Sequence, residues 1–152
     1  ALNKKKFSKY DFKKIHPSGS LAKKLITVEN LMATGNNIPF VNENMKVSKS
    51  LNIMSKKKLG CLVVLNKEKF LTGFISDGDL RRKSKKAILN LKVKDIMTKN
   101  PLIIDKNILA VKALELLNKH SITSLIVGKT FNKNKIKAIG LLHIHQVLKI
   151  GI

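Results

Sequence analysis

The residues of this chain that are best suited to chemistry stand where an apolar segment meets the start of a helix. Phe70-Leu-Thr-Gly-Phe-Ile75 is followed by Ser76-Asp-Gly-Asp-Leu-Arg-Arg82, so Ser76 and Asp79 have the spacing of a helix cap and its partner. Backbone amides at a helix start attract phosphate, and a carboxylate accepts hydrogen bonds from sugar hydroxyls. The same two side chains can also satisfy the first-turn amides without any ligand. Two interpretations of this junction therefore stay open: a phosphate-containing ligand and a plain helix cap.

Gly73 lies inside the apolar segment before this junction. A glycine within a strand marks a bulge or the close approach of another group. The candidate ligand-binding residues of this half are therefore Gly73, Ser76 and Asp79.

A second junction of the same kind lies in the C-terminal half. Gly140-Leu-Leu-His-Ile-His145 leads into a helix start where His143 and Gln146 replace the serine and the aspartate. No carboxylate remains there for a sugar hydroxyl, although the two histidines could contact a phosphate or a carboxylate. A metal site is not predicted, because His-Ile-His needs further ligands and no acid or cysteine lies nearby in the sequence. The candidate ligand-binding residues of this half are Thr123, Ser124, His143 and His145.

Both junctions belong to a repeated unit. Leu62 aligns with Leu125 at an offset of 63 residues, and Gly73 aligns with Gly140 at an offset of 67 residues. Each unit alternates short apolar runs with amphipathic segments, so we predict an α+β fold of two β-α-β-β-α repeats with three strands in each sheet. Two helices cover one face of such a sheet and leave the other bare, so the halves should pack together and leave ligand-binding clefts.

The pattern of apolar residues also predicts the approximate bounds of these elements. Helices are expected at 20–25, 28–32, 44–57, 77–83, 93–97, 107–119 and after 142, and strands at 38–41, 62–65, 70–75, 102–104, 123–128 and 136–142.

The length and composition of the chain limit the number of domains and the cellular compartments that are compatible with it. With 152 residues, 43% of them hydrophobic, the chain suits one domain or two small halves that share a core. Its apolar runs are too short for a membrane helix, and the basic N-terminus shows no secretory signal. The single cysteine, Cys61, is expected to be a buried small hydrophobic residue. We therefore expect a cytoplasmic protein without membrane contact.

The net charge of +22 at neutral pH raises the question of nucleic-acid binding. Only Arg81 and Arg82 among the 31 basic residues are arginine, although arginine forms the bidentate contacts that nucleic-acid recognition favours. The lysines are spread along the chain, and one tyrosine and no tryptophan leave little for base stacking. Nucleic-acid binding is therefore disfavoured and kept only as an alternative.

The closing motif of the first repeat carries a resemblance to a known family. Tandem units with Gly73-x-x-Ser76-x-x-Asp79-Leu80 resemble a pair of CBS domains, the Bateman module, in which two such repeats pack around an approximate twofold axis. More specifically, Thr72-Gly-Phe-Ile-Ser-Asp-Gly-Asp-Leu-Arg-Arg82 resembles a segment of D-arabinose-5-phosphate isomerases of the KpsF/GutQ type. The same family resemblance extends to His16-Pro-Ser-Gly-Ser-Leu21, Ile122-Thr-Ser-Leu-Ile-Val127, Gly140-Leu-Leu-His-Ile-His145 and Leu148-Lys-Ile-Gly151.

This resemblance implies that the chain is part of a larger enzyme. Members of the family carry a sugar-isomerase (SIS) domain before the CBS pair and interconvert D-ribulose 5-phosphate and D-arabinose 5-phosphate, a step toward Kdo and lipopolysaccharide. Residues 1–27 are accordingly expected to be the seam to a missing SIS domain, residues 28–90 the first CBS domain and residues 91–152 the second. His16 would end the catalytic domain and take part in proton transfer during enolisation, which is possible only in the full-length enzyme.

The resemblance also implies a regulatory ligand. In that family the serine or threonine and the aspartate of the closing motif often hold the phosphate and ribose of an adenosine nucleotide. We therefore expect the chain, which alone is no enzyme and requires no cofactor, to bind an adenosine nucleotide or CMP-Kdo, the end product of the pathway. The implied protein partners are the SIS domain and a second CBS pair, as a homodimer of pairs and a tetramer of the full enzyme. The main alternative is a purely structural dimerisation module with an empty cleft.

Overall fold

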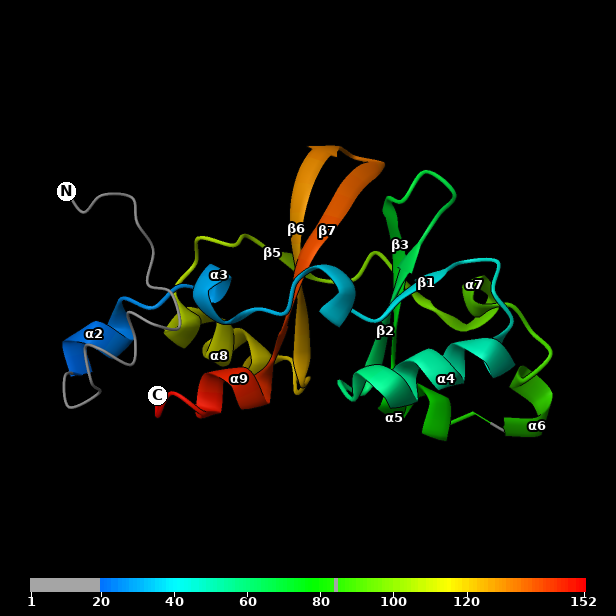
Figure 1. Ribbon diagram of the computed structural model, residues 1–152, viewed down its shortest axis with the longest axis horizontal. Coiled ribbons are helices and arrows are strands. Elements are labelled where there is room, and N and C mark those ends of the chain that lie inside the picture. The colour runs from blue at the N-terminus through cyan, green and yellow to red at the C-terminus, as the bar shows by residue number, and fades with distance from the viewer. Residues whose placement is uncertain (1–19, 84) are drawn as a thin grey trace. The chain divides into compact units, whose positions relative to one another are not determined.

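The chain divides into two compact units that each combine parts of both sequence repeats. The computed structural model describes residues 20–83 and 85–152 (Figure 1), so the predictions for residues 1–19, including the role of His16, lie outside the described residues. Among the described residues, unit 1 contains residues 20–33, Ile103–Val127 and Gly140–Ile152, and unit 2 contains Thr34–Leu102 and Gly128–Ile139. The predicted division at residues 27 and 90 follows the sequence repeats and stays a prediction.

Unit 2 contains a four-stranded sheet in the order β1-β2-β3-β4. β1 (Phe40–Asn42) runs parallel to β2 (Cys61–Leu65), which pairs antiparallel with β3 (Leu71–Ser76), and β3 pairs antiparallel with β4 (Thr98–Lys99). β2 is buried at every position, as is typical of an apolar interior strand. Pro39 directly precedes the edge strand β1, where its missing N–H breaks no ladder.

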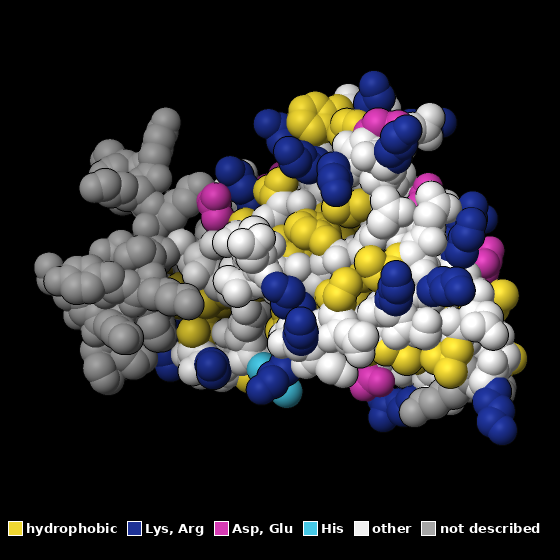
Figure 2. Space-filling model, turned by 45° about the vertical axis from the view of Figure 1, so that its right-hand side comes forward, with side chains coloured by type: hydrophobic (Ala, Val, Ile, Leu, Met, Phe, Trp, Pro, Cys, Tyr) yellow, Lys and Arg dark blue, Asp and Glu magenta, His cyan; other side chains and the backbone are white. Residues whose placement is uncertain are grey.

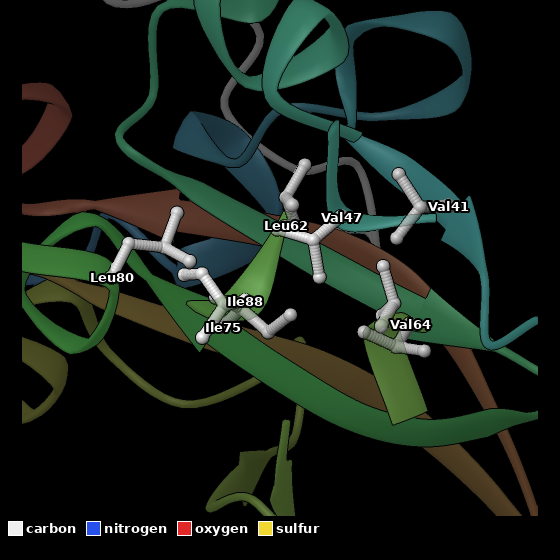
Figure 3. Packing of buried hydrophobic residues seen from close by; sticks show 8 residues of the cluster. Val41, Val47, Leu62, Val64, Ile75, Leu80 and Ile88 are labelled. Atoms are coloured by element: carbon white, nitrogen blue, oxygen red, sulfur yellow. The ribbon is translucent and has the colours of Figure 1, made fainter. Parts of the chain in front are cut away.

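Helices cover the sheet of unit 2 and close its core. α4 (Val47–Lys57) packs against β2, and α5 (Asp77–Arg81) packs against β3 (Figure 1). The remaining helical segments of this unit are η1 (Gly35–Asn37), α6 (Lys85–Ile88) and α7 (Val93–Ile96). Figure 3 shows the buried cluster between these elements, to which Val41, Val47, Leu62, Val64, Ile75, Leu80, Ile88 and Val93 contribute. Cys61 is 2% exposed, which confirms its predicted burial.

The second sheet has three strands in the order β5-β6-β7. β5 (Ile103–Ile104) runs parallel to β6 (Ser124–Asn132), and β7 (Lys135–His143) is the other neighbour of β6. β5, the start of β6 and the end of β7 belong to unit 1, whereas Gly128–Ile139, around the turn between β6 and β7, belongs to unit 2. α8 (Ala110–Lys119) contacts α9 (Ile144–Leu148) and α3 (Val28–Leu31), and α2 (Ser20–Lys24) precedes them. β6 and β7 are longer than predicted, because the residues that were expected to form a loop continue both strands toward the turn.

The two long helices begin three residues later than the sequence predicts. The amide of Val47 donates to the carbonyl of Leu91 at 2.9 Å, and the amide of Ala110 donates to the carbonyl of Ile26 at 2.8 Å. Distant backbone thus satisfies the first free amide of each helix, in place of a capping side chain. The predicted starts at 44 and 107 were wrong because these partners are far away in the sequence.

Two methionine side chains lie against glycines of the strands: Met97 against Gly73 on β3, and Met32 against Gly140 on β7. A Cβ on Gly73 would stand 2.6 Å from Cγ of Met97, and a Cβ on Gly140 would stand 2.8 Å from Cγ of Met32. The residues after each methionine also join these strands: Thr98 and Lys99 form β4 beside β3, and Ala33 exchanges two backbone hydrogen bonds with Leu141. The segment that leads into each repeat is therefore packed on the last strand of the other repeat. The prediction of three strands per sheet was wrong for unit 2, since it missed β4.

The distribution of basic side chains bears on nucleic acids as a partner, and the lengths of the helices bear on membranes. Figure 2 shows lysine and arginine side chains dispersed over the face in view, with no single dense patch. Among residues 20–83 and 85–152, no helix is long and apolar enough to cross a membrane.

We predict that Gly73→Ala destabilises the chain, because the new methyl group would overlap the Met97 side chain. Overpacking of this kind costs about 1–3 kcal/mol of unfolding free energy, measurable by urea denaturation. Gly78→Ala is the matched control, since a Cβ there meets nothing closer than 3.8 Å. Equal stability of the two variants would contradict the packing role of Gly73.

Candidate functional site

At the first junction, the strand β3 passes directly into α5 through a reciprocal pair of hydrogen bonds. Ser76 is the N-cap, and its hydroxyl oxygen accepts a hydrogen bond from the amide of Asp79 at 3.0 Å. The amide of Ser76 donates to Oδ2 of Asp79 at 3.1 Å. This capping box was one of the two interpretations that the sequence left open, and the structure contains it.

The second carboxylate oxygen of Asp79 has a charged partner. Nη2 of Arg82 lies 2.7 Å from Oδ1 of Asp79, one helical turn further along. Burial raises the pKa of the Asp79 carboxyl, but the amide and hydroxyl of Ser76 and the guanidinium of Arg82 outweigh it and leave this pKa below its ordinary value. Asp79 is therefore an ionised carboxylate at neutral pH, and sequence reasoning missed Arg82 although the i, i+3 spacing of an acid and a base on a helix could have indicated it.

The second junction, between β7 and α9, has the same backbone arrangement with different side chains. The amide of His143 donates to Oε1 of Gln146 at 2.7 Å, and the amide of His145 donates to Nδ1 of His143 at 3.1 Å. The two imidazole rings lie 4.6 Å apart between centroids. The carbonyl of Thr123 accepts the amide of Ile144 at 2.8 Å, which ties the start of β6 to the start of α9.

The imidazole of His143 is neutral in this arrangement. Burial lowers the pKa of His143, and the charge of the neighbouring His145 lowers it further. Because Nδ1 accepts a hydrogen bond, the proton of the neutral ring is on Nε2. Protonation of Nδ1 would remove the acceptor that caps α9.

The same cap recurs at four short helices and shows what the fold itself requires. In each case the amide of the cap residue donates to a side-chain oxygen three residues on, at 2.7–3.1 Å. The four pairs are Thr27 with Asn30, Ser76 with Asp79, Lys92 with Asp95, and His143 with Gln146. Amide oxygens serve as well as carboxylates, so the cap needs an acceptor and no charge. The negative charge of Asp79 therefore exceeds what the cap demands.

The remaining candidate residues differ in their surroundings. Gly73 is buried beneath Met97, so packing alone accounts for a glycine there. Thr123 is exposed, whereas Ser124 is 6% exposed and its hydroxyl has no hydrogen-bond partner among the described residues. Gly73, Ser76 and Asp79 belong to unit 2, and Thr123, Ser124, His143 and His145 belong to unit 1. Their predicted roles in ligand binding stay predictions.

Within residues 20–83 and 85–152, no three histidine, cysteine, aspartate or glutamate side chains are grouped closely enough to hold a metal ion. The side chains at the two junctions offer hydrogen bonds and charge: a carboxylate and a guanidinium at the first, and two imidazoles at the second.

Comparison with protein families finds one description for both repeats. The family model described as "CBS domain" matches residues 28–86 and 93–151. "Arabinose 5-phosphate isomerase KdsD" of Francisella tularensis subsp. tularensis is 38% identical over 99% of this chain and 46% of that protein. The protein of the same name from Escherichia coli K12 is 32% identical over 99% of this chain and 45% of that protein. An uncharacterised protein of Rickettsia prowazekii, RP505, is 40% identical over 96% of this chain and 44% of that protein. The chain thus spans less than half the length of these relatives.

Solved structures with the same fold include two described as nucleotide complexes. "CBSX2 in complex with AMP" superposes with a TM-score of 0.65 at 27% identity, covering 81% of this chain and 93% of that chain. The CBS domain of a bacterial CNNM/CorC family Mg²⁺ transporter in complex with ATP has a TM-score of 0.69 at 17% identity and covers 86% of this chain and 89% of that chain. CBS domains of a Streptococcus pneumoniae transcriptional regulator have a TM-score of 0.68 at 16% identity, covering 82% and 98%. The predicted tandem arrangement of two repeats is confirmed by these matches.

We predict that the unfolding free energy depends on the protonation of His143. The folded pKa lies below the ordinary value of about 6.5, so the unfolded chain binds the proton more tightly. The stabilisation is fully present above pH 6.5 and is lost as the pH falls through the folded pKa. Urea denaturation between pH 8 and pH 5 should show this loss in the wild type and a smaller one in His143→Asn, whose amide oxygen caps a helix at either pH. A histidine titration followed by NMR that gives His143 a pKa above 6.5 would contradict this assignment.

Proposed function

This chain belongs to the CBS domain family, and on that premise we propose that it is the regulatory, nucleotide-binding module of an arabinose-5-phosphate isomerase. The nucleotide binds at the first junction, where Asp79 accepts hydrogen bonds from the ribose hydroxyls and Ser76 contacts a phosphate. The observation that carries this proposal is the ionised carboxylate of Asp79, whose charge the helix cap does not require.

The relatives support both parts of the proposal. A structural relative at 27% identity is described as a complex with AMP, which supports an adenosine nucleotide as the ligand. Relatives at 32–38% identity are named arabinose 5-phosphate isomerases, and this chain covers less than half of each, which supports a module attached to an isomerase domain. CMP-Kdo is the second ligand to test, since end-product control suits a pathway enzyme. A ligand that prefers one arrangement of the module would shift the activity of the attached domain.

Within this proposal the second junction does not bind a ribose. Gln146 holds the position of Asp79 and offers an amide in place of a carboxylate. His143 is neutral and uses Nδ1 for the cap, so it offers neither a charge nor a free Nδ1 acceptor. We therefore expect one nucleotide site per chain, at the first junction.

A second candidate function is a structural module without a ligand. It is favoured by the fact that Ser76 and Asp79 already satisfy each other and that Arg82 already neutralises the carboxylate. In that case the charge of Asp79 would serve only the ion pair, which is largely exposed and contributes at most about 1 kcal/mol. The two functions differ in whether any nucleotide stabilises the fold.

We expect thermal unfolding with AMP, ATP, CMP-Kdo and arabinose 5-phosphate to identify the ligand. A nucleotide at a hundredfold its dissociation constant should add about 2.7 kcal/mol to the unfolding free energy. Asp79→Asn should abolish this stabilisation, because it removes the charge but keeps an oxygen for the cap. Asp95→Asn makes the same chemical change at the equivalent cap of α7 and should keep the full ligand effect.

The outcome separates the two functions. Loss of the ligand effect in Asp79→Asn, with the unliganded variant still folded, supports the nucleotide site. No shift with any of the four compounds in the wild type would favour the structural module, and equal loss in both variants would mean that the effect is not specific to the first junction.

A further inference from the structure

We propose that Arg82 selects phosphorylated ligands at the first junction. In the unliganded chain its guanidinium occupies the carboxylate of Asp79, and a bound nucleotide takes its place and offers it a phosphate instead. This inference rests on the proposed nucleotide-binding function and deepens it, since it names the residue that distinguishes a nucleotide from a nucleoside.

The two oxygens of Asp79 are held in different ways, so only one is open to exchange. Oδ2 accepts the amide of Ser76 at 3.1 Å and is part of the cap that starts α5. Within residues 20–83 and 85–152, the partner of Oδ1 is Nη2 of Arg82, at 2.7 Å. A ribose that reached Asp79 without breaking the cap would therefore compete with Arg82 for Oδ1.

The guanidinium can be displaced because it lies on the solvent side of the pair. The side chain of Arg82 is 74% exposed, whereas that of Asp79 is 28% exposed. Ion pairs with such an exposed partner contribute little to stability, since water solvates the released charge. A ligand therefore displaces Arg82 without a large loss of folding stability.

The other edge of the guanidinium is already directed toward the first turn of α5. A Cβ placed on Gly78 would lie 3.9 Å from Nη1 of Arg82 and 3.8 Å from the hydroxyl oxygen of Ser76. The absence of a side chain at Gly78 thus leaves room between a guanidinium and a hydroxyl group. Both are donors to phosphate, and the guanidinium forms strong charge-assisted hydrogen bonds with it.

The exchange makes affinity depend on the phosphate. An unphosphorylated nucleoside must separate Arg82 from Asp79, and it has no phosphate with which the freed guanidinium could form a new ion pair. A nucleotide separates the same pair and then binds the freed guanidinium through its phosphate. Arg82 therefore lowers the affinity for adenosine and raises the affinity for AMP.

Arg81 provides a matched control on the same helix. It has the same charge, but Nη2 of Arg81 pairs with Oδ2 of Asp77 at 3.6 Å, and both side chains are exposed. No contact of Arg81 with Ser76 or Asp79 is found among the described residues. Substitution of Arg81 removes one positive charge near the junction but leaves the ion pair between Arg82 and Asp79 intact.

The test is the ratio of the affinities for AMP and adenosine, measured by isothermal titration calorimetry in the wild type, Arg82→Gln and Arg81→Gln. In Arg82→Gln we expect AMP to bind several-fold more weakly and adenosine two- to fivefold more tightly, so the ratio falls about tenfold. Arg81→Gln should keep the wild-type ratio. Urea denaturation of each variant checks that the fold is retained.

The failures of this inference and of the proposed function are distinguishable. An unchanged ratio in Arg82→Gln, or an equal fall in Arg81→Gln, overturns the role of Arg82 while nucleotide binding stands. If the wild type binds neither compound, the proposed nucleotide function fails, and the assignment of Arg82 fails with it.

Discussion

The packing of a methionine against a strand glycine is the constraint on which the rest of this structure depends. Met97 fills the space above Gly73, and Met32 fills the space above Gly140, so that a methyl group on either glycine would collide with the sulfur-containing side chain. The residues after each methionine then bind to the same strand through backbone hydrogen bonds. Because the leading segment of each repeat completes the sheet of the other, neither repeat contains all the parts of its own sheet and core. This exchange explains why the segment before Thr34 groups with parts of the second repeat and why the segment up to Leu102 groups with the first.

The glycines also position the candidate site. Gly73 lies on β3 three residues before Ser76, and the covered strand leads directly into the cap of α5. The cap orients Asp79 so that one oxygen serves the backbone and the other faces Arg82. At the second junction the side-chain oxygen of Gln146 accepts the backbone amide of His143, and Gln146 carries no charge that could pair with a base. Comparison of the two junctions therefore separates what the fold needs, an oxygen, from what only the first junction adds, a charge.

Sequence reasoning predicted the features that depend on local pattern. The repeat follows from matching patterns in the two halves of the chain. The burial of Cys61 and the cap formed by Ser76 and Asp79 follow from the residue types and spacing within one short segment. The features it missed depend on partners far away in the chain. The later starts of α4 and α8 depend on carbonyls of Leu91 and Ile26, and β4 depends on pairing with β3. These contacts cannot be predicted from periodicity in the sequence. The position of the Arg82 guanidinium close to Gly78 cannot be predicted from it either.

The proposed function depends on nucleotide binding at the first junction alone. The most direct test is the stoichiometry of AMP binding to this chain, measured by calorimetry at protein concentrations well above the dissociation constant. We expect one AMP per chain, because one junction offers an ionised carboxylate and the other an amide and a neutral imidazole. Two equivalent sites per chain would contradict it, since the second junction would then bind the ribose without the charge of Asp79.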